Sequence, residues 1–133
     1  MVTALFARAL RAAPIGLLLL SPATAHAEIR DYEFRLDRKE VALGEVELPV
    51  RLFDKRTGQN LSDAVIFAWR LDMAPDGMED MSAAAKLQNG EPLGTYRFKA
   101  KLPMRGHWRL SLAGKVQGEL GTVRGSLTFE ATK

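Results

Sequence analysis

The sequence predicts an all-β protein, a small antiparallel β-sandwich of the immunoglobulin-like kind. Short runs in which apolar and polar residues alternate follow one another along the chain, and turn residues separate these runs at regular spacing. Beyond residue 27, no segment shows the 3.6-residue period of an amphipathic helix. Six or seven such strands in about a hundred residues are typical of a sandwich, with a closed barrel as the alternative.

Residues 1–27 have the features of a secretory signal peptide. Two arginines form a basic start, an apolar run covers residues 15–20, and residues 25–27 (Ala-His-Ala) form an A-x-A cleavage site. The apolar run is shorter than the roughly 20 residues of a membrane-spanning helix. We therefore expect cleavage after Ala27 and a mature periplasmic domain over residues 28–133 with no stable membrane span. An uncleaved N-terminal membrane anchor is the alternative.

Charge and cysteine content narrow the class of protein. The chain has 19 Lys and Arg against 16 Asp and Glu, and the signal removes two arginines and no acid, which leaves 17 against 16, or +1. The basic residues are mixed with acidic ones instead of forming one stripe, so we expect no nucleic-acid binding. The chain has no cysteine, so it has neither disulfides nor thiolate ligands and depends on its core for stability.

The first half of the mature chain contains three expected strands. Alternation predicts strands over residues 29–36 and 46–52. Pro49 has no N–H to donate, so the second strand is expected to be at a sheet edge, or bulged, at that point. The strand over residues 64–71 is apolar on both faces, and this favours a central position in its sheet.

The second half supplies three further strands, over residues 95–102, 108–112 and 123–129. Before them, residues 82–88 are either extended or one helical turn, and Asn89-Gly90 is a turn. Inward positions of all these strands form the expected core, and both tryptophans belong to it. The core residues named by the pattern are Val65, Phe67, Trp69, Tyr96, Phe98, Trp108, Leu110, Leu127 and Phe129.

The four methionines of the mature chain and its single histidine lie in two loops, over residues 72–81 and 103–107. If residues 82–88 cross the domain, counting strands places both loops at one pole of the sandwich. Thioether sulfur and imidazole suit copper, and thioethers favour Cu(I) over the harder divalent ions. The sequence therefore predicts a Cu(I) site. Its candidate ligands are Met73, Met78, Met81, Met104 and His107.

Each candidate also has a structural interpretation. Met73 and Met104 each follow an inward leucine by two positions and can continue the core face. Met78 and Met81 are flanked by acidic residues, where there is less core to fill. His107 should point outward, where a histidine is commonly just solvated. The methionine loops also suit a contact surface for a partner protein.

Two stretches around these loops carry a recognisable pattern. Its residues are Asp72, Met73, Pro75, Gly77 and Met78, then Gly94, Tyr96, Leu102, Pro103, Met104, Gly106 and Trp108. The pattern, over about residues 63–112, resembles the FixH-like/YtkA-like family of exported β-sandwich domains. The resemblance implies an immunoglobulin-like sandwich and a copper-linked role, with copper-transport or oxidase-assembly proteins as partners. Family members often carry further His or Met in the first loop, where this chain has Asp76-Gly77.

Enzymatic chemistry has little support in the sequence. A Ser-His-Asp site would need His107 as its base, and no nucleophile elbow lies near that residue. The chain has no EF-hand pattern and no glycine-rich phosphate loop. We expect no enzyme, no catalytic residue and no cofactor besides copper. Two function classes remain, a copper-handling accessory protein and a protein-interaction or structural module.

Overall fold

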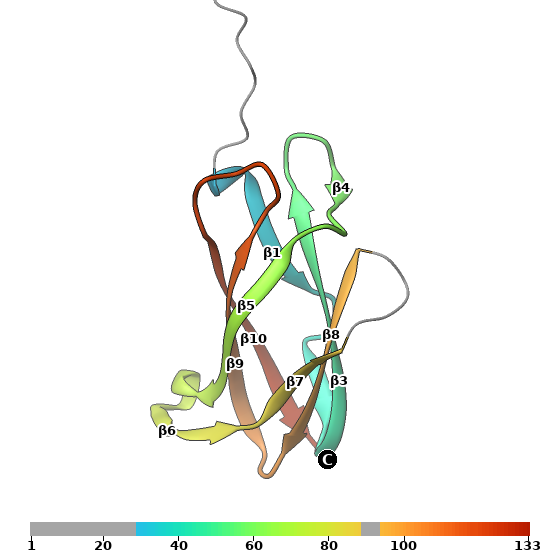
Figure 1. Cartoon of the computed structure of the whole chain (residues 1–133). Helices are drawn as coiled ribbons and strands as arrows, with labels where there is room; N and C mark the ends of the chain where they lie inside the picture. The colour runs from blue at the N-terminus through green and yellow to red at the C-terminus, as the bar shows by residue number, and fades with distance from the viewer. Residues whose placement is uncertain (1–28, 89–93) are drawn as a thin grey trace, which may run out of the picture.

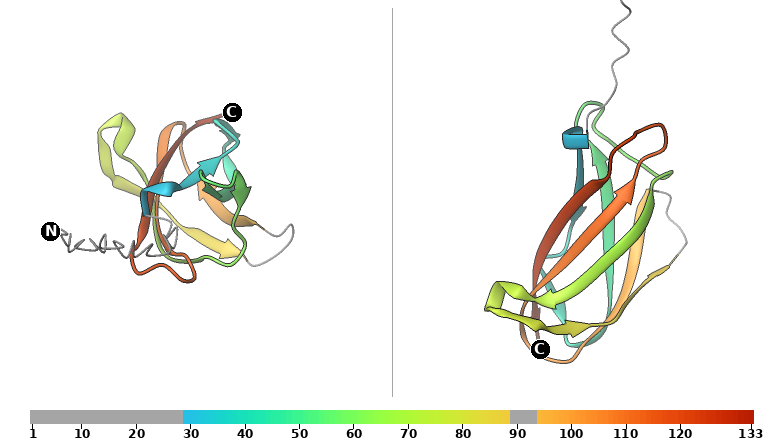
Figure 2. Two further views of the ribbon diagram at one scale, coloured as in Figure 1. Left: turned by 90° about the horizontal axis from the view of Figure 1, so that it is seen from above. Right: turned by 60° about the vertical axis from the view of Figure 1, so that its left-hand side comes forward.

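Two β-sheets packed face to face make up the domain, as Figures 1 and 2 show. The structure is a computed structural model that describes residues 29–88 and 94–133. The expected signal peptide, residues 1–27, and the expected turn at Asn89-Gly90 lie outside the described residues. Within the described ranges, no helix is both long enough and apolar enough to cross a membrane.

Within residues 29–88 and 94–133, the strands divide five and five between the sheets. The first sheet contains β1 (Tyr32–Leu36), β3 (Gly44–Asp54), β8 (Thr95–Leu102) and β7 (Ala85–Gln88) in that order, with β4 (Gln59–Asn60) paired to β3. The second contains β2 (Glu40–Ala42), β10 (Val123–Thr132), β9 (Gly106–Lys115), β5 (Val65–Met73) and β6 (Met78–Ala83). All pairs are antiparallel except β10 with β2. The predicted all-β sandwich is therefore confirmed, with one parallel pair added.

Two 3-10 turns, η1 (Ile29–Asp31) and η2 (Ala74–Asp76), complete the element order. The segment of uncertain conformation, residues 82–88, is extended: it ends β6 in one sheet and, past Ala84, forms β7 in the other. The chain thus crosses from sheet to sheet along one side of the sandwich (Figure 1). This crossing is the condition on which the shared pole of the two methionine loops depends.

The expectation that the strand is at an edge at Pro49 is met locally, although β3 as a whole lies inside its sheet. β3 is an interior strand, with β1 on one side and β8 on the other, and not an edge strand. Pairing with β1 begins only at Val50, however, whereas Pro49 is paired with Arg97 of β8. At Pro49 itself β3 has a neighbour on one side, so the missing N–H falls where the β1 ladder has ended.

The prediction for residues 64–71 is wrong in two respects. β5 pairs with β9 along its length but with β6 only from Leu71 onward, so most of it is an edge and not a central strand. A bulge between Ile66 and Ala68 also changes which residues face inward. Ile66 is buried, whereas Val65 and Phe67 are 64% and 51% exposed and lie outside the core.

Buried side chains from both sheets fill the space between them. Phe98, Trp108, Leu110 and Phe129 are essentially inaccessible, as the alternation predicts, and Leu127 packs against them half-buried. The remaining members of the core cluster come from all the long strands. Burial of this apolar area is the main stabilising term in a chain that has no disulfide.

Trp69 has a different role from the one expected. Its side chain lies at the open side of the sandwich, where the ring meets Phe98 edge-on at 5.3 Å and Nε1 donates to the Ala85 carbonyl oxygen at 2.8 Å. These contacts join β5 to β7 and β8, which belong to the other sheet. Trp69 therefore closes the side that β5 and β7 leave unpaired.

Tyr96 fixes the connection that leads into β5. Its hydroxyl donates to the Leu61 carbonyl oxygen at 2.9 Å and accepts from the Ala64 N–H at 3.1 Å. Burial raises the pKa of Tyr96, so the phenol keeps its proton and can do both. A tyrosine hydroxyl bonded to upstream backbone in this way is a recurring feature of immunoglobulin-like sandwiches.

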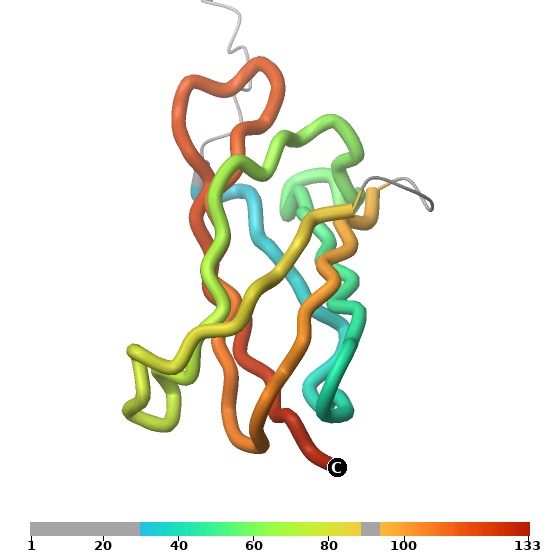
Figure 3. Tube along the Cα trace, turned by 60° about the horizontal axis from the view of Figure 1, so that its bottom comes forward, coloured from blue at the N-terminus to red at the C-terminus, as the bar shows by residue number. Residues whose placement is uncertain are grey.

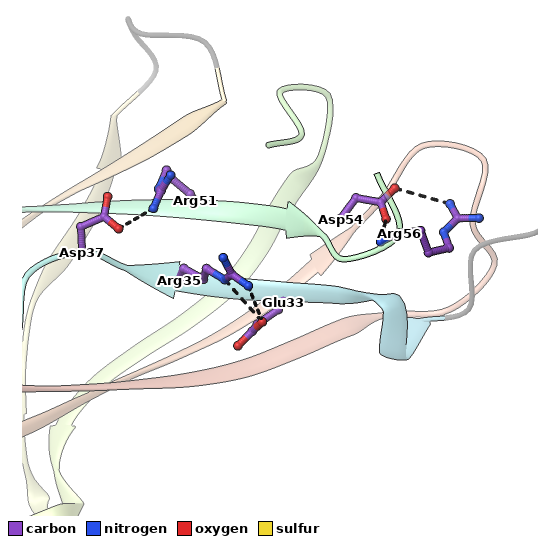
Figure 4. A network of polar contacts seen from close by, with 6 residues as sticks. All are labelled: Glu33, Arg35, Asp37, Arg51, Asp54 and Arg56. Atoms are coloured by element: carbon purple, nitrogen blue, oxygen red, sulfur yellow. Dashed lines mark hydrogen bonds and ion pairs between the residues drawn. The ribbon is translucent and has the colours of Figure 1, made fainter. Parts of the chain in front are cut away.

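Ion pairs lie around β1 and β3 of the first sheet, as Figure 4 shows. They join Arg35 to Glu33, Arg51 to Asp37 and Arg56 to Asp54. The Arg35 and Arg51 pairs are exposed, and such pairs typically contribute about 0–1 kcal/mol each, whereas Asp54 of the third pair is buried.

Candidate functional site

The two methionine loops lie at one pole of the sandwich, as predicted. The backbone N–H of His107 donates to Oδ2 of Asp76 at 2.7 Å, and His107 Nδ1 lies 2.9 Å from Oδ1 of the same carboxylate. These two contacts join the start of β9 to η2. Figures 1 and 3 show the η2 loop and the β8–β9 turn at the end of the domain where the C-terminus lies.

Local interactions fix the shape of the η2 loop. Oδ1 of Asp72 accepts the N–H of Ala74 at 3.0 Å, and Pro75 supplies the fixed φ that suits the first turn. The turn ends at Gly77, whose φ of 74° is left-handed and whose N–H bonds back to the Ala74 carbonyl oxygen. Asp76 is thereby presented to β9 on a short, defined turn.

Asp72 anchors this loop to the outer face of the second sheet. Its side chain is 1% exposed and accepts from Arg70 Nε at 2.9 Å and Arg109 Nη2 at 3.2 Å. Burial alone would raise the pKa of Asp72, but the Ala74 N–H and the two guanidinium groups outweigh burial and lower it. The charged carboxylate is therefore the form that holds the loop.

Acid should weaken the domain through Asp72. Because its pKa is lower in the folded than in the unfolded chain, its stabilisation is complete above the unfolded value of about 3.9 and is lost as pH falls through the folded value. We expect the Asp72→Asn variant to lose less unfolding free energy than wild type below about pH 4, as measured by urea unfolding across pH. Asp80→Asn is the control, since Asp80 is exposed. Equal pH profiles for wild type and Asp72→Asn would contradict this assignment.

The carboxylate of Asp76 sets the state of the His107 ring. A carboxylate only accepts hydrogen bonds, so Nδ1 of the neutral imidazole carries the hydrogen and Nε2 keeps its lone pair. The His107 side chain is 53% exposed. The backbone N–H and then the ring of His107 lower the pKa of Asp76, which keeps this partner charged. The arrangement leaves one oriented ring nitrogen with a free lone pair at the pole.

The four methionines occupy different environments. Met73 is fully buried within the core cluster, so it continues the core face, which is its structural interpretation. Met104 is half-buried against the core, and its carbonyl oxygen accepts Trp108 Nε1 at 3.2 Å. Met78 and Met81, on β6, are 38% and 37% exposed. Two thioethers therefore reach the surface at the pole, one lies partly covered and one lies inside.

The donor groups at the pole favour a soft metal over a hard one. Within the described residues, no three His, Cys, Asp or Glu side chains are grouped so as to hold a metal ion. Carboxylate-rich sites for Ca²⁺ or Mg²⁺ and Cys- or His-rich sites for Zn²⁺ therefore have no counterpart there. The pole carries an imidazole nitrogen and exposed thioethers, donor types that suit copper.

Two further residues, Asp76 and Gly106, shape the pole, and sequence reasoning assigned neither of them a role there. Asp76 was counted only as the absence of a further ligand, although it orients His107. Gly106 has a φ of 138°, and a Cβ placed there would overlap Met73 Cε and lie 2.5 Å from Asp76 Oδ2. The M-x-G-x-W pattern was the available signal for Gly106, because only glycine allows the η2 loop to approach β9 this closely.

A separate hollow of about 480 Å³ lies over the outer face of β3, β8 and β7. Charged residues of both signs line it, namely Glu45, Glu47, Lys86, Lys99 and Lys101. It contains none of the five candidate ligands. The candidate ligands at the pole and this hollow, called the larger hollow below, therefore lie on different parts of the surface.

Comparison with known proteins supports the family resemblance. A family model described as YtkA-like matches residues 26–113. No curated protein was found to match the chain. The Lin-41 filamin domain is a similar solved structure, with 17% identity and a TM-score of 0.48 over 77% of this chain and 92% of that one. The ZirS C-terminal domain has 8% identity and the same TM-score, over 80% and 68%. Both scores are low, so the fold class rests on the sheets described above.

Proposed function

This chain belongs to the YtkA-like family, whose model covers more than half of it, and on that premise we propose a non-enzymatic accessory protein that binds Cu(I) at the methionine pole. We also propose that the protein reaches the periplasm through a cleaved signal peptide. Copper-transport or oxidase-assembly proteins are the proposed partners.

The orientation of His107 by Asp76 is the observation that carries the proposal. Metal-ligating histidines almost always donate their second ring N–H to a carboxylate, a carbonyl or water, which fixes the tautomer and makes the free nitrogen more basic. Asp76 makes this contact at 2.9 Å and adds a second bond to the backbone of the same residue. A merely solvated histidine needs neither contact.

Met78 and Met81 are the proposed sulfur ligands. Both are exposed on β6, which pairs with β5 next to the η2 loop, and they carry the soft donors that the single imidazole lacks. Met104 is the next candidate, because its side chain is partly accessible. Met73 is left out of the proposed set, since a fully buried thioether could reach an exchanging ion only if the core opened.

An exposed site of few ligands suits transfer of the ion better than permanent storage. A partner's donor atoms can approach a metal that is held by side chains at the surface, and one ligand can be exchanged at a time. The proposed ion is thus cargo and not a resident cofactor.

Titration with Cu(I) in competition with a chromophoric chelator tests the proposal. Met78→Leu combined with Met81→Leu keeps the apolar bulk and removes both sulfurs, so the affinity should fall by about tenfold or more. Asp76→Asn should weaken binding by about 10–100-fold, because the ring loses its orienting carboxylate. Binding should also weaken in acid, since a protonated imidazole has no lone pair for a metal.

Met73→Leu is the matched control, because it removes a sulfur that lies inside the core. Its affinity for Cu(I) should equal that of wild type. If wild type binds no Cu(I), or the double variant binds as tightly as wild type, the copper assignment fails. The exposed methionines would then be better explained as a contact surface for a partner protein.

A further inference from the structure

A hollow of about 200 Å³ on the outer face of the second sheet has features of an anion site; Trp69 and the core residue Leu112 also line it. It lies over β5, β9 and the start of β10, and its floor has small side chains. Ala68 is placed opposite Ala113 by the β5 bulge, and Ser111 is the next outward residue of β9. Ala113 is 4% exposed, so its methyl group lies below the surrounding surface.

Two arginines stand on opposite sides of this floor. Arg70 of β5 is paired with Ser111, and Arg124 of β10 is paired with Ala113. The two arginines therefore lie on either side of β9, at positions two residues apart along that strand. Residues opposite or diagonal across neighbouring strands have Cβ atoms about 5–8 Å apart. Both guanidinium groups can therefore reach an ion that lies over Ser111.

Donors in the hollow exceed the acceptors. Arg70 uses Nε for Asp72 and Nη2 for the Glu79 carbonyl oxygen, which leaves Nη1 unused among the described contacts. Within residues 29–88 and 94–133, neither Arg124 nor the Ser111 hydroxyl has a hydrogen-bond or ion-pair partner. The carboxylate of Asp72, which Arg70 contacts, already accepts three hydrogen bonds and is buried.

In this lack of an acceptor the hollow differs from the paired arginines of the first sheet and from the larger hollow. On the first sheet, Arg35, Arg51 and Arg56 each have a carboxylate partner, and the lysines of the larger hollow lie beside two glutamates. Among the described residues, no acidic one lines the smaller hollow. Guanidinium groups bind the paired oxygens of carboxylates and phosphates in a fork geometry that lysine lacks.

We propose that this hollow, lined by Arg70, Ser111 and Arg124, binds an oxyanion, the carboxylate or phosphate group of a small ligand or of a lipid headgroup. Arg70 and Arg124 supply the charge, and the Ser111 hydroxyl supplies a neutral hydrogen bond. The small floor residues admit the ion between the guanidinium groups. Copper binding at the pole is not required for this site.

Titration of the isotope-labelled protein with inorganic phosphate and with succinate, followed by amide chemical shifts, tests the proposal. Shifts should centre on Ser111, Ala113 and Arg124. Arg124→Gln should weaken binding by about tenfold or more, because one charge-assisted hydrogen bond is lost. Lys99→Gln removes the same charge from the other sheet and should leave the affinity unchanged. Arg124 and Lys99 are exposed, so neither variant should unfold the domain.

A second arm uses vesicles that contain an anionic phospholipid, at two salt concentrations. Vesicle binding that is lost in Arg124→Gln and kept in Lys99→Gln supports a lipid headgroup as the source of the oxyanion. Binding of the free anions alone, with the same dependence on Arg124, supports a small ligand. An adventitious ion only, shown by equal affinities of wild type and Arg124→Gln or by shifts spread over all surface cations, would overturn the proposal, as would no binding in either arm.

Discussion

Replacing Trp108 with alanine is expected to lower the free energy of unfolding by about 3–5 kcal/mol. The Trp108 side chain is fully buried between the sheets, so its loss removes apolar burial and leaves a cavity that the close-packed neighbours fill only in part. The change also removes the Nε1 hydrogen bond to the Met104 carbonyl oxygen, which ties the β8–β9 turn to the core. Urea unfolding followed by circular dichroism measures the effect.

Trp69→Ala is the matched comparison for this result. Trp69 is 36% exposed and lies at the side of the sandwich. The Trp69→Ala change therefore removes less buried area and leaves a site open to water. Its cost should be clearly smaller than that of Trp108→Ala. A Trp108→Ala variant as stable as wild type, or less affected than Trp69→Ala, would contradict the assignment of Trp108 to the centre of the core.

Replacing Gly106 with alanine should damage both the fold and the proposed copper site. The backbone conformation at φ 138° costs about 1–3 kcal/mol for a residue with a side chain. The added Cβ would also overlap Met73 and Asp76, so the η2 loop would have to move away from β9. We expect lower unfolding free energy in urea and, because Asp76 no longer orients His107, weaker binding in the Cu(I) competition titration.

Gly118→Ala separates backbone strain from overlap at the pole. Gly118 also has a positive φ, of 88°, but a Cβ there meets nothing within 4 Å, and it lies in the β9–β10 hairpin away from the pole. This variant should lose some stability and keep its Cu(I) affinity. If Gly106→Ala behaves in the same way, the close approach of η2 to β9 does not matter for the metal.

Alternation along single strands was readable because successive side chains of a strand point to opposite faces. It located β3, β8, β9 and β10 and placed Phe98, Trp108 and Phe129 in the core. The same rule failed in β5, since one extra residue at the bulge reverses the inward face before it. Nothing in the run of apolar residues over 64–71 marks where that extra residue falls.

The sequence by itself determined the sandwich class, the clustering of methionines and histidine in two loops, and the soft character of their donor atoms. These depend on residue type and on short-range spacing. Only the tertiary structure decided which methionines are accessible and that Asp76 holds His107 from 31 positions away. It also decided that Arg70 and Arg124 share a hollow. Each of these depends on strand register and pairing, which bring distant residues together and which local alternation does not encode.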